Sequence, residues 1–206
     1  AAALTATGNA LRDRYISSGE HPLLHDAIDA AEEALQLTPA DHHLHAARQT
    51  NLAVLLSDEY SESSSLPQLD RAITLYREAL NAPENEDLRI TERQNDLALA
   101  LRERFHGSLD PQDLAEALHL GEQAVTSTSR DSPAWAGYAN NYANALMERY
   151  EIDSTADDLN QAIDLFDSAL HDARGRAAEE SGYLTNLGLA LATRAHADAD
   201  TADDDF

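Results

Sequence analysis

Apolar residues recur along this chain at the spacing of amphipathic helices. The stretch 69–80 is typical, because its apolar side chains follow the i, i+3, i+4, i+7 rule that places them on one helix face. These side chains are Leu69, Ala72, Ile73, Tyr76, Ala79 and Leu80. A preceding helix centres on 51–60 and is expected to bury Leu52, Ala53, Leu56 and Tyr60. The two stretches predict a hairpin of two helices packed along their apolar faces.

The same pattern returns every 45 residues without an insertion. An aromatic column holds Tyr15, Tyr60, Phe105 and Tyr150, and a leucine column holds Leu11, Leu56, Leu101, Leu146 and Leu191. A fixed period of this size predicts stacked two-helix repeats and argues against a single globular core. We therefore expect an all-α fold, a right-handed α-solenoid of helix-turn-helix repeats.

The period also sets the expected boundaries. Four repeats should span about 1–40, 41–85, 86–130 and 131–175, followed by a half repeat at 176–197. The first residue falls inside a first helix, and residue 204 falls where another second helix should begin, so we expect a segment of a longer protein. Residues 198–206 are rich in aspartate and are expected to form a disordered tail.

Caps and small residues keep the same register. Ser65, Asp110 and Thr155 stand 45 residues apart where second helices should begin, and all three are good N-cap residues. Asp158 follows Thr155 at nearly the spacing of a capping box. Small residues occupy two columns, Gly8/Ala53/Ala98/Ala143/Gly188 and Ala34/Ala79/Ala124/Ala169. Close packing of the two helices in each hairpin requires such side chains.

The net charge is −24, from 38 acidic and 14 basic residues, and every basic residue is arginine. Such a surface disfavours nucleic acid and anionic membranes as partners. We interpret the charge first as a solubility feature, with a basic partner attracted by the field as the alternative. The chain has no cysteine, and we find no signal peptide or apolar run of membrane length, so a cytoplasmic location is expected.

Both helices of the repeat carry the residue pattern of a known motif. The first helices carry Leu52-Ala53-x-x-Leu56 and Tyr142-Ala143-x-x-Leu146, and the second helices carry Ala72-x-x-x-Tyr76-x-x-Ala79 and Ala162-x-x-x-Phe166-x-x-Ala169. This arrangement resembles the tetratricopeptide repeat along the whole chain. The period of 45 is longer than the usual about 34 residues, the aromatic slot holds Ala31 and Gly121 in two repeats, and the tryptophan slot lacks tryptophan.

The long version, with the end Leu11 to Tyr15 and its counterparts, is similar to repeat arrays of bacterial and fungal proteins that carry a CHAT protease or an NTPase domain. That resemblance implies a sensor or scaffold segment of a larger protein. It also implies that the first helices line a concave groove. The positions that the resemblance places in this groove, and that we select as candidate partner-binding residues, are Asn9, Arg12, Thr50, Asn95, Arg102, Asn140, Asn144 and Met147.

The chemistry of these candidates suits a peptide. An asparagine amide both donates and accepts hydrogen bonds, and an arginine can pair with a carboxylate. The alternative is that the asparagines face water and that Arg102 pairs with neighbouring acids. A second column, Asn51, Asp96, Asn141 and Asn186, lies beside the buried leucines. It is expected to make hydrogen bonds between adjacent repeats, or else to form the floor of the groove.

Histidines cluster at His42, His43 and His45, but no carboxylate spacing completes a recognised metal site. We find no phosphate-binding loop, nucleophile elbow or metalloprotease motif, and we expect neither a cofactor nor enzymatic activity. The leading hypothesis is a scaffold that binds a protein or peptide in the groove. The alternative is a structural module that associates with copies of itself as a homo-oligomer.

Overall fold

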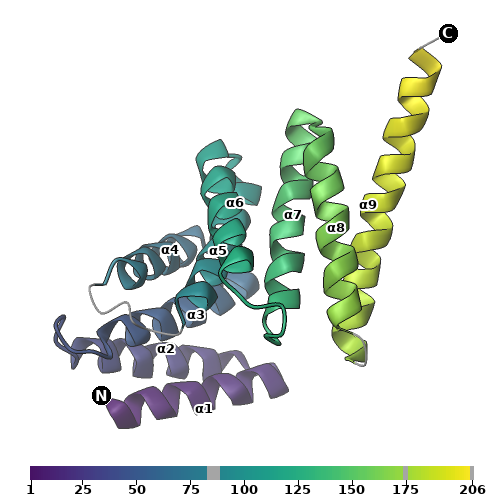
Figure 1. The fold of residues 1–206 in the computed structure, drawn as a ribbon. Helices are drawn as coiled ribbons and strands as arrows, with labels where there is room; N and C mark the ends of the chain where they lie inside the picture. The colour runs from purple at the N-terminus through teal and green to yellow at the C-terminus, as the bar shows by residue number, and fades with distance from the viewer. Residues whose placement is uncertain (83–88, 174–175, 205–206) are drawn as a thin grey trace. The chain divides into compact units, whose positions relative to one another are not determined.

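The computed structural model describes residues 1–82, 89–173 and 176–204, and this part of the chain contains nine helices and no strand (Figure 1). The helices are α1 (Ala2–Ser18), α2 (His21–Gln36), α3 (His45–Ser63), α4 (Leu66–Leu80), α5 (Ile90–Ser108), α6 (Pro111–Thr126), α7 (Trp135–Asp153), α8 (Ala156–Asp172) and α9 (Ala177–Asp204). The prediction of an all-α fold is confirmed.

The chain divides into two compact units. The N-terminal unit, Ala1–Leu109, holds α1 to α5, and the C-terminal unit, Asp110–Phe206, holds α6 to α9. Within each unit every helix packs on the next one along the chain, and α3 also touches α5, as α7 touches α9. This serial packing is that of an all-α helical-repeat solenoid. The odd-numbered helices are the first helices of the repeats, and the even-numbered ones are the second helices.

The second helices begin at the predicted N-caps, Ser65, Asp110 and Thr155. The Asp110 carboxylate accepts a hydrogen bond from the Gln112 backbone N–H at 3.0 Å. The prediction of a near capping box at Thr155 is wrong, because the Thr155 side chain makes no hydrogen bond to the helix N-terminus. The Asp158 carboxylate instead accepts two bonds from Arg149, at 2.7 and 2.6 Å. A bidentate ion pair is stronger than a hydrogen bond to a neutral backbone N–H, so the Asp158 carboxylate binds Arg149 and does not cap the helix.

The first helices end on a second column, Gly19, Ser64, Leu109 and Ser154. Each adopts a left-handed conformation, with φ between 53° and 71°. Each backbone N–H bonds to the carbonyl of the aromatic residue four positions earlier. This turn satisfies a carbonyl at the helix end and directs the chain into the second helix. An L side chain is strained at positive φ, so Leu109, like Ser64 and Ser154, adopts this conformation at a cost in free energy.

Apart from Gly188, the residues of the small-residue columns are buried. Ala34, Ala79, Ala124 and Ala169 are all buried. At Gly8 a Cβ would stand 3.3 Å from the Ala27 carbonyl oxygen, so even an alanine there would require α1 and α2 to shift slightly apart. Gly188 on α9 differs from its column, since a Cβ there would meet nothing within 4 Å. In the described part of the chain, no second helix follows α9 to cover it.

The C-terminal segment differs from its prediction. Helix α9 extends to Asp204, so the structure places 198–204, expected to be disordered, at the end of this helix. Alanines alternate with the aspartates there, and alanine is the strongest helix former. Residues 205–206 lie outside the described residues. No helix in the described ranges has the length and apolar character needed to cross a membrane.

Candidate functional site

A groove opens across the first helices of the N-terminal unit. Two cavities of about 450 and 330 Å³ adjoin there, and both are lined by Arg12 of α1, Val54 of α3, and Glu92 and Asp96 of α5. The groove is defined here as Asn9, Arg12, Asp13, Thr50, Asn51, Val54, Ser57, Asp58, Ser61, Tyr76, Arg89, Glu92, Asp96, Leu99 and Glu103. It joins three successive repeats, because α1, α3 and α5 belong to the first, second and third.

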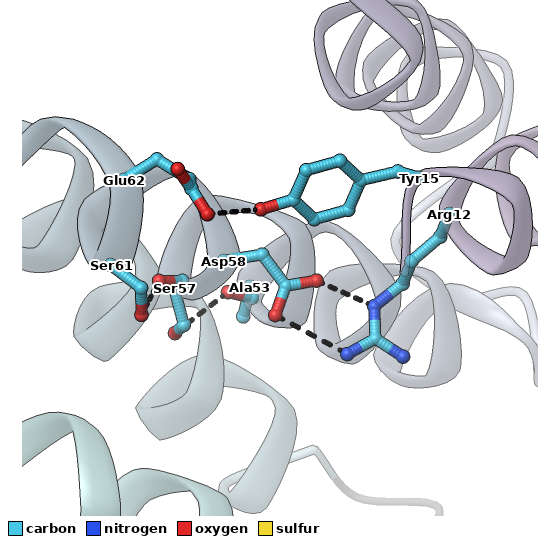
Figure 2. A network of polar contacts seen from close by, with 7 residues as sticks. All are labelled: Arg12, Tyr15, Ala53, Ser57, Asp58, Ser61 and Glu62. Atoms are coloured by element: carbon cyan, nitrogen blue, oxygen red, sulfur yellow. Dashed lines mark hydrogen bonds and ion pairs between the residues drawn. The ribbon is translucent and has the colours of Figure 1, made fainter. Parts of the chain in front are cut away.

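An ion pair fixes one wall of the groove. The Arg12 guanidinium donates to both carboxylate oxygens of Asp58, from Nε at 2.6 Å and from Nη2 at 3.3 Å (Figure 2). This hydrogen bond raises the pKa of Arg12. Beside it the Tyr15 hydroxyl donates to Glu62 at 2.7 Å, which raises the pKa of Tyr15 to about 12. Both contacts tie α1 to α3, so Arg12 has an internal carboxylate partner before any peptide arrives.

Asp96 lies where the two cavities meet, and it lines both of them. Its Oδ1 accepts a hydrogen bond from the Asn95 side-chain amide at 3.3 Å. Burial, aided by the nearby charge of Glu92, raises the pKa of Asp96 to about 6, while the Asn95 bond and the Arg12 charge act in the opposite direction. The groove therefore contains a carboxylate that is poorly hydrated and only weakly compensated.

The Tyr76 side chain reaches the larger cavity from α4, although it is only 2% exposed. Burial raises the pKa of its phenol, with the charge of Asp96 as the next contribution and a hydrogen bond to Ser57 opposing both. Ser57 and Ser61 also line this cavity, and their hydroxyls donate to the Ala53 and Ser57 carbonyls at 3.0 and 3.1 Å (Figure 2). The wall thus combines an aromatic side chain with hydroxyls that are already hydrogen-bonded.

The side chains of two predicted binding residues already make hydrogen bonds within the fold. The Thr50 hydroxyl donates to the Ala46 carbonyl at 2.9 Å and accepts from Arg93 Nε at 2.8 Å, so Thr50 lines the smaller cavity with a satisfied side chain. Asn95 is 8% exposed and directs its amide to Asp96. The Arg93 side chain is almost fully buried, and its hydrogen bond to Thr50 links α5 to α3. Internal packing explains these polar residues without a ligand.

The candidates of the C-terminal unit lie on α7. Asn186 of α9 donates to the Asn140 side-chain carbonyl at 2.8 Å, and Asn140 donates to Asn141 at 3.5 Å. The Asn144 amide donates to the Asn140 backbone carbonyl at 2.9 Å. Met147 is partly buried on the same helix. Of these three bonds, the one between Asn186 and Asn140 joins adjacent repeats, which is the structural role expected for the second asparagine column, and the other two lie within α7.

The structure brings Asn9, Arg12 and Thr50 together in the groove, whereas Asn95 lies beside it and Arg102 is partly buried on α5. The sequence predicted Tyr76 only as a core residue, and no feature of its position indicated that it lines a cavity. Asp96 could have been noticed, because it is the single acidic residue in the column that otherwise holds asparagines. Asn51 and Asp96 of that column line the groove, as expected if the column forms its floor.

Another cavity, of about 630 Å³, lies in the C-terminal unit between α9 and the pair α7 and α8. Its lining includes Tyr150, Leu159, Asn160, Arg194 and His196. Within the described residues, no three histidine or acidic side chains are grouped so that they could hold a metal ion. This cavity offers one cationic and few acidic groups, so its chemistry differs from that of the groove.

Comparison with known proteins identifies a fold and no family. No family model matches the chain, and no curated protein matches it. Among solved structures, the crystal structure of BtubC (BKLC) from P. vanneervenii aligns with a TM-score of 0.56 and 18% sequence identity. The alignment covers 98% of this chain and 88% of that one. At this level of identity the likeness concerns the arrangement of the helices alone.

Proposed function

We propose that this chain is a scaffold of tetratricopeptide-like repeats that binds a protein or peptide in the groove of the N-terminal unit. The observation that carries the proposal is the pair of adjoining cavities, which share Arg12, Val54, Glu92 and Asp96 across three successive repeats. An elongated hollow that follows several repeats suits an extended segment of chain. Concave surfaces of stacked repeats serve such binding in many proteins.

The lining supports a binding role more than a catalytic one. The two serines of the larger cavity donate to backbone carbonyls, and among the described residues that line the groove there is no histidine to act as their base. Asp58 is held by Arg12. The proposal therefore assigns no enzymatic activity. It places the chain as the sensor or regulatory part of a larger cytoplasmic protein, whose partner is a protein and not a nucleic acid, given the net charge of −24.

A substitution that fills the groove tests this function. Val54 lines both cavities, so Val54→Arg fills the hollow where they meet, and Leu37→Arg places the same side chain on an exposed position outside it. In pull-downs from a lysate of the source organism, the wild type and Leu37→Arg should capture a common protein that Val54→Arg loses. Circular dichroism confirms that both variants fold. Equal capture by a folded Val54→Arg protein would move recognition away from the groove.

Self-association is a second candidate, and the uncovered face of α9 favours it. Leu191 is 39% exposed, whereas its counterparts Leu56, Leu101 and Leu146 are fully buried. Leu184 on the same helix is 58% exposed. Light scattering during size-exclusion chromatography tests this candidate, because a dimer that dissociates in Leu184→Gln/Leu191→Gln supports it. A monomer at every concentration would refute it.

A further inference from the structure

We infer that Asp96 anchors a cationic side chain, the ammonium of a lysine or the guanidinium of an arginine, of a peptide bound in the groove. This inference rests on the proposed function of the groove and names the chemical class of its ligand. It depends on three observations: the charge of the lining, the position of Asp96 relative to the cavities, and the residues that the other repeats carry at the same slot.

The lining of the groove is strongly acidic. The acidic residues of its two cavities are Asp13, Asp58, Glu92, Asp96 and Glu103, and the basic ones are Arg12 and Arg89. Arg12 is already paired with Asp58, so the remaining charge is dominated by carboxylates. A hollow lined by one sign of charge concentrates the field within it and attracts ligands of the opposite sign. Charge complementarity thus selects a basic segment over a neutral or acidic one.

Asp96 and Glu92 both line the two cavities, and Asp96 is the more buried of these two carboxylates. The hydrogen bond from the Asn95 amide engages one of the Asp96 oxygens, Oδ1. An ionised carboxylate has capacity for further donors, which an ammonium or a guanidinium provides. Tyr76 lines the larger cavity as well, although it is only 2% exposed. With about 450 Å³, this cavity is within the roughly 300–1,000 Å³ that is common for ligand sites.

The repeats themselves show that an acid is not needed at this slot for folding. Its counterparts are Asn51, Asn141 and Asn186, and Asn186 makes its hydrogen bond to the neighbouring repeat as a neutral amide. Burying a carboxylate there is less favourable than burying an amide. A departure of this kind from a repeat pattern is expected at functional positions, where stability is given up for binding. A cationic ligand would neutralise the charge that folding leaves uncompensated.

The test uses three five-residue peptides that differ only in the central residue, acetyl-Ala-Ala-X-Ala-Ala-amide with arginine, glutamine or glutamate as X. Each is titrated into the isotopically labelled protein while backbone amide signals are followed by NMR. The arginine peptide should bind most tightly and should shift the signals of Ser57, Asp96 and Leu99. Asp96→Asn should weaken its binding by about ten- to a hundred-fold, which is the range for one hydrogen bond between charged groups.

A matched control separates this effect from the general charge of the protein. Asp29→Asn removes one negative charge from an exposed position on α2 in the same unit and should leave the affinity unchanged. Asp96→Asn introduces the residue of three other repeats, so we expect it to fold, and its unfolding midpoint checks this. Unchanged binding of the arginine peptide by Asp96→Asn would overturn the assignment of Asp96.

The neutral and acidic peptides distinguish failure of this inference from failure of the proposed function. If all three peptides shift the groove signals with equal affinity, the preference for a cation is wrong and the groove remains a peptide site. If the glutamate peptide binds best, the inference is likewise overturned. If none of the three shifts any groove signal, both the cationic anchor and peptide binding in this groove are contradicted.

Discussion

Replacing Asp96 with asparagine should make the protein more stable, and by an amount that depends on pH. Burial raises the pKa of Asp96 from 3.8 to about 6 in the folded protein. Between these two values the unfolded chain has lost the proton and the folded chain still holds it. The folded state thus binds more protons in this window, and stability falls as the pH rises through it. Above pH 6 the whole penalty is present.

The pKa difference sets the magnitude. A shift of about two units corresponds to an upper limit of about 3 kcal/mol of lost stability near pH 8. About half of this loss develops between pH 5 and pH 8, so Asp96→Asn should gain about 1.4 kcal/mol over the wild type across that interval. Glu92 on the same helix contributes to the raised pKa, and Arg12 on α1 opposes it, so both must stay intact in the comparison.

Urea unfolding followed by circular dichroism measures this difference. The wild type, Asp96→Asn and the exposed control Asp29→Asn are compared at pH 5 and pH 8, both above the isoelectric point of about 4.4. The advantage of Asp96→Asn should grow with pH, while that of Asp29→Asn should stay near zero. An equal advantage at both pH values would indicate a packing effect. A variant no more stable than the wild type at pH 8 would refute the account of Asp96 as a weakly compensated buried carboxylate.

Three further predictions test the fold. Leu146→Ala should lower the free energy of unfolding by about 2–5 kcal/mol because Leu146 is fully buried, whereas Leu191→Ala on the uncovered face of α9 should lower it by less than about 1 kcal/mol; equal losses in urea would contradict that difference. Asp110→Ala should lose about 1 kcal/mol with its cap bond, and Thr155→Ala only a few tenths; thermal melts in the reverse order would refute the cap assignments. Leu109→Gly should gain about 0.5–1 kcal/mol by relieving its left-handed strain, and a lower Tm would contradict this.

The sequence predicted those features of the fold that repeat. Side-chain spacing at 3.6 residues per turn and the 45-residue period fix which faces are buried, so the helical hairpins, the N-caps and the alanine columns could all be foreseen. Asp158 could not, because its partner Arg149 comes from the preceding helix and competes with the local cap. At the end of the chain the acidic composition suggested disorder, whereas α9 extends to Asp204, where interspersed alanines favour helix.

The site was predicted less well than the fold. The register placed Asn9, Arg12 and Thr50 on one face of their helices, and all three line the groove. It could not show that Arg12 is paired with Asp58 or that Thr50 is bonded to Arg93, because such contacts depend on the distance between neighbouring repeats. Asp96 broke the asparagine column, and departures from a repeat pattern deserve more weight than the residues that keep it.

Site-specific photo-crosslinking tests the central claim most directly. Ser61 is exposed and lines the larger cavity, so benzoylphenylalanine at this position samples whatever occupies the groove, and the same residue in place of the exposed Leu37 serves as the control. After irradiation in a lysate of the source organism, mass spectrometry identifies the attached segments. The account predicts adducts at position 61, absent at position 37, whose attached segment contains arginine or lysine. Adducts with acidic segments, or equal labelling at both positions, would contradict it.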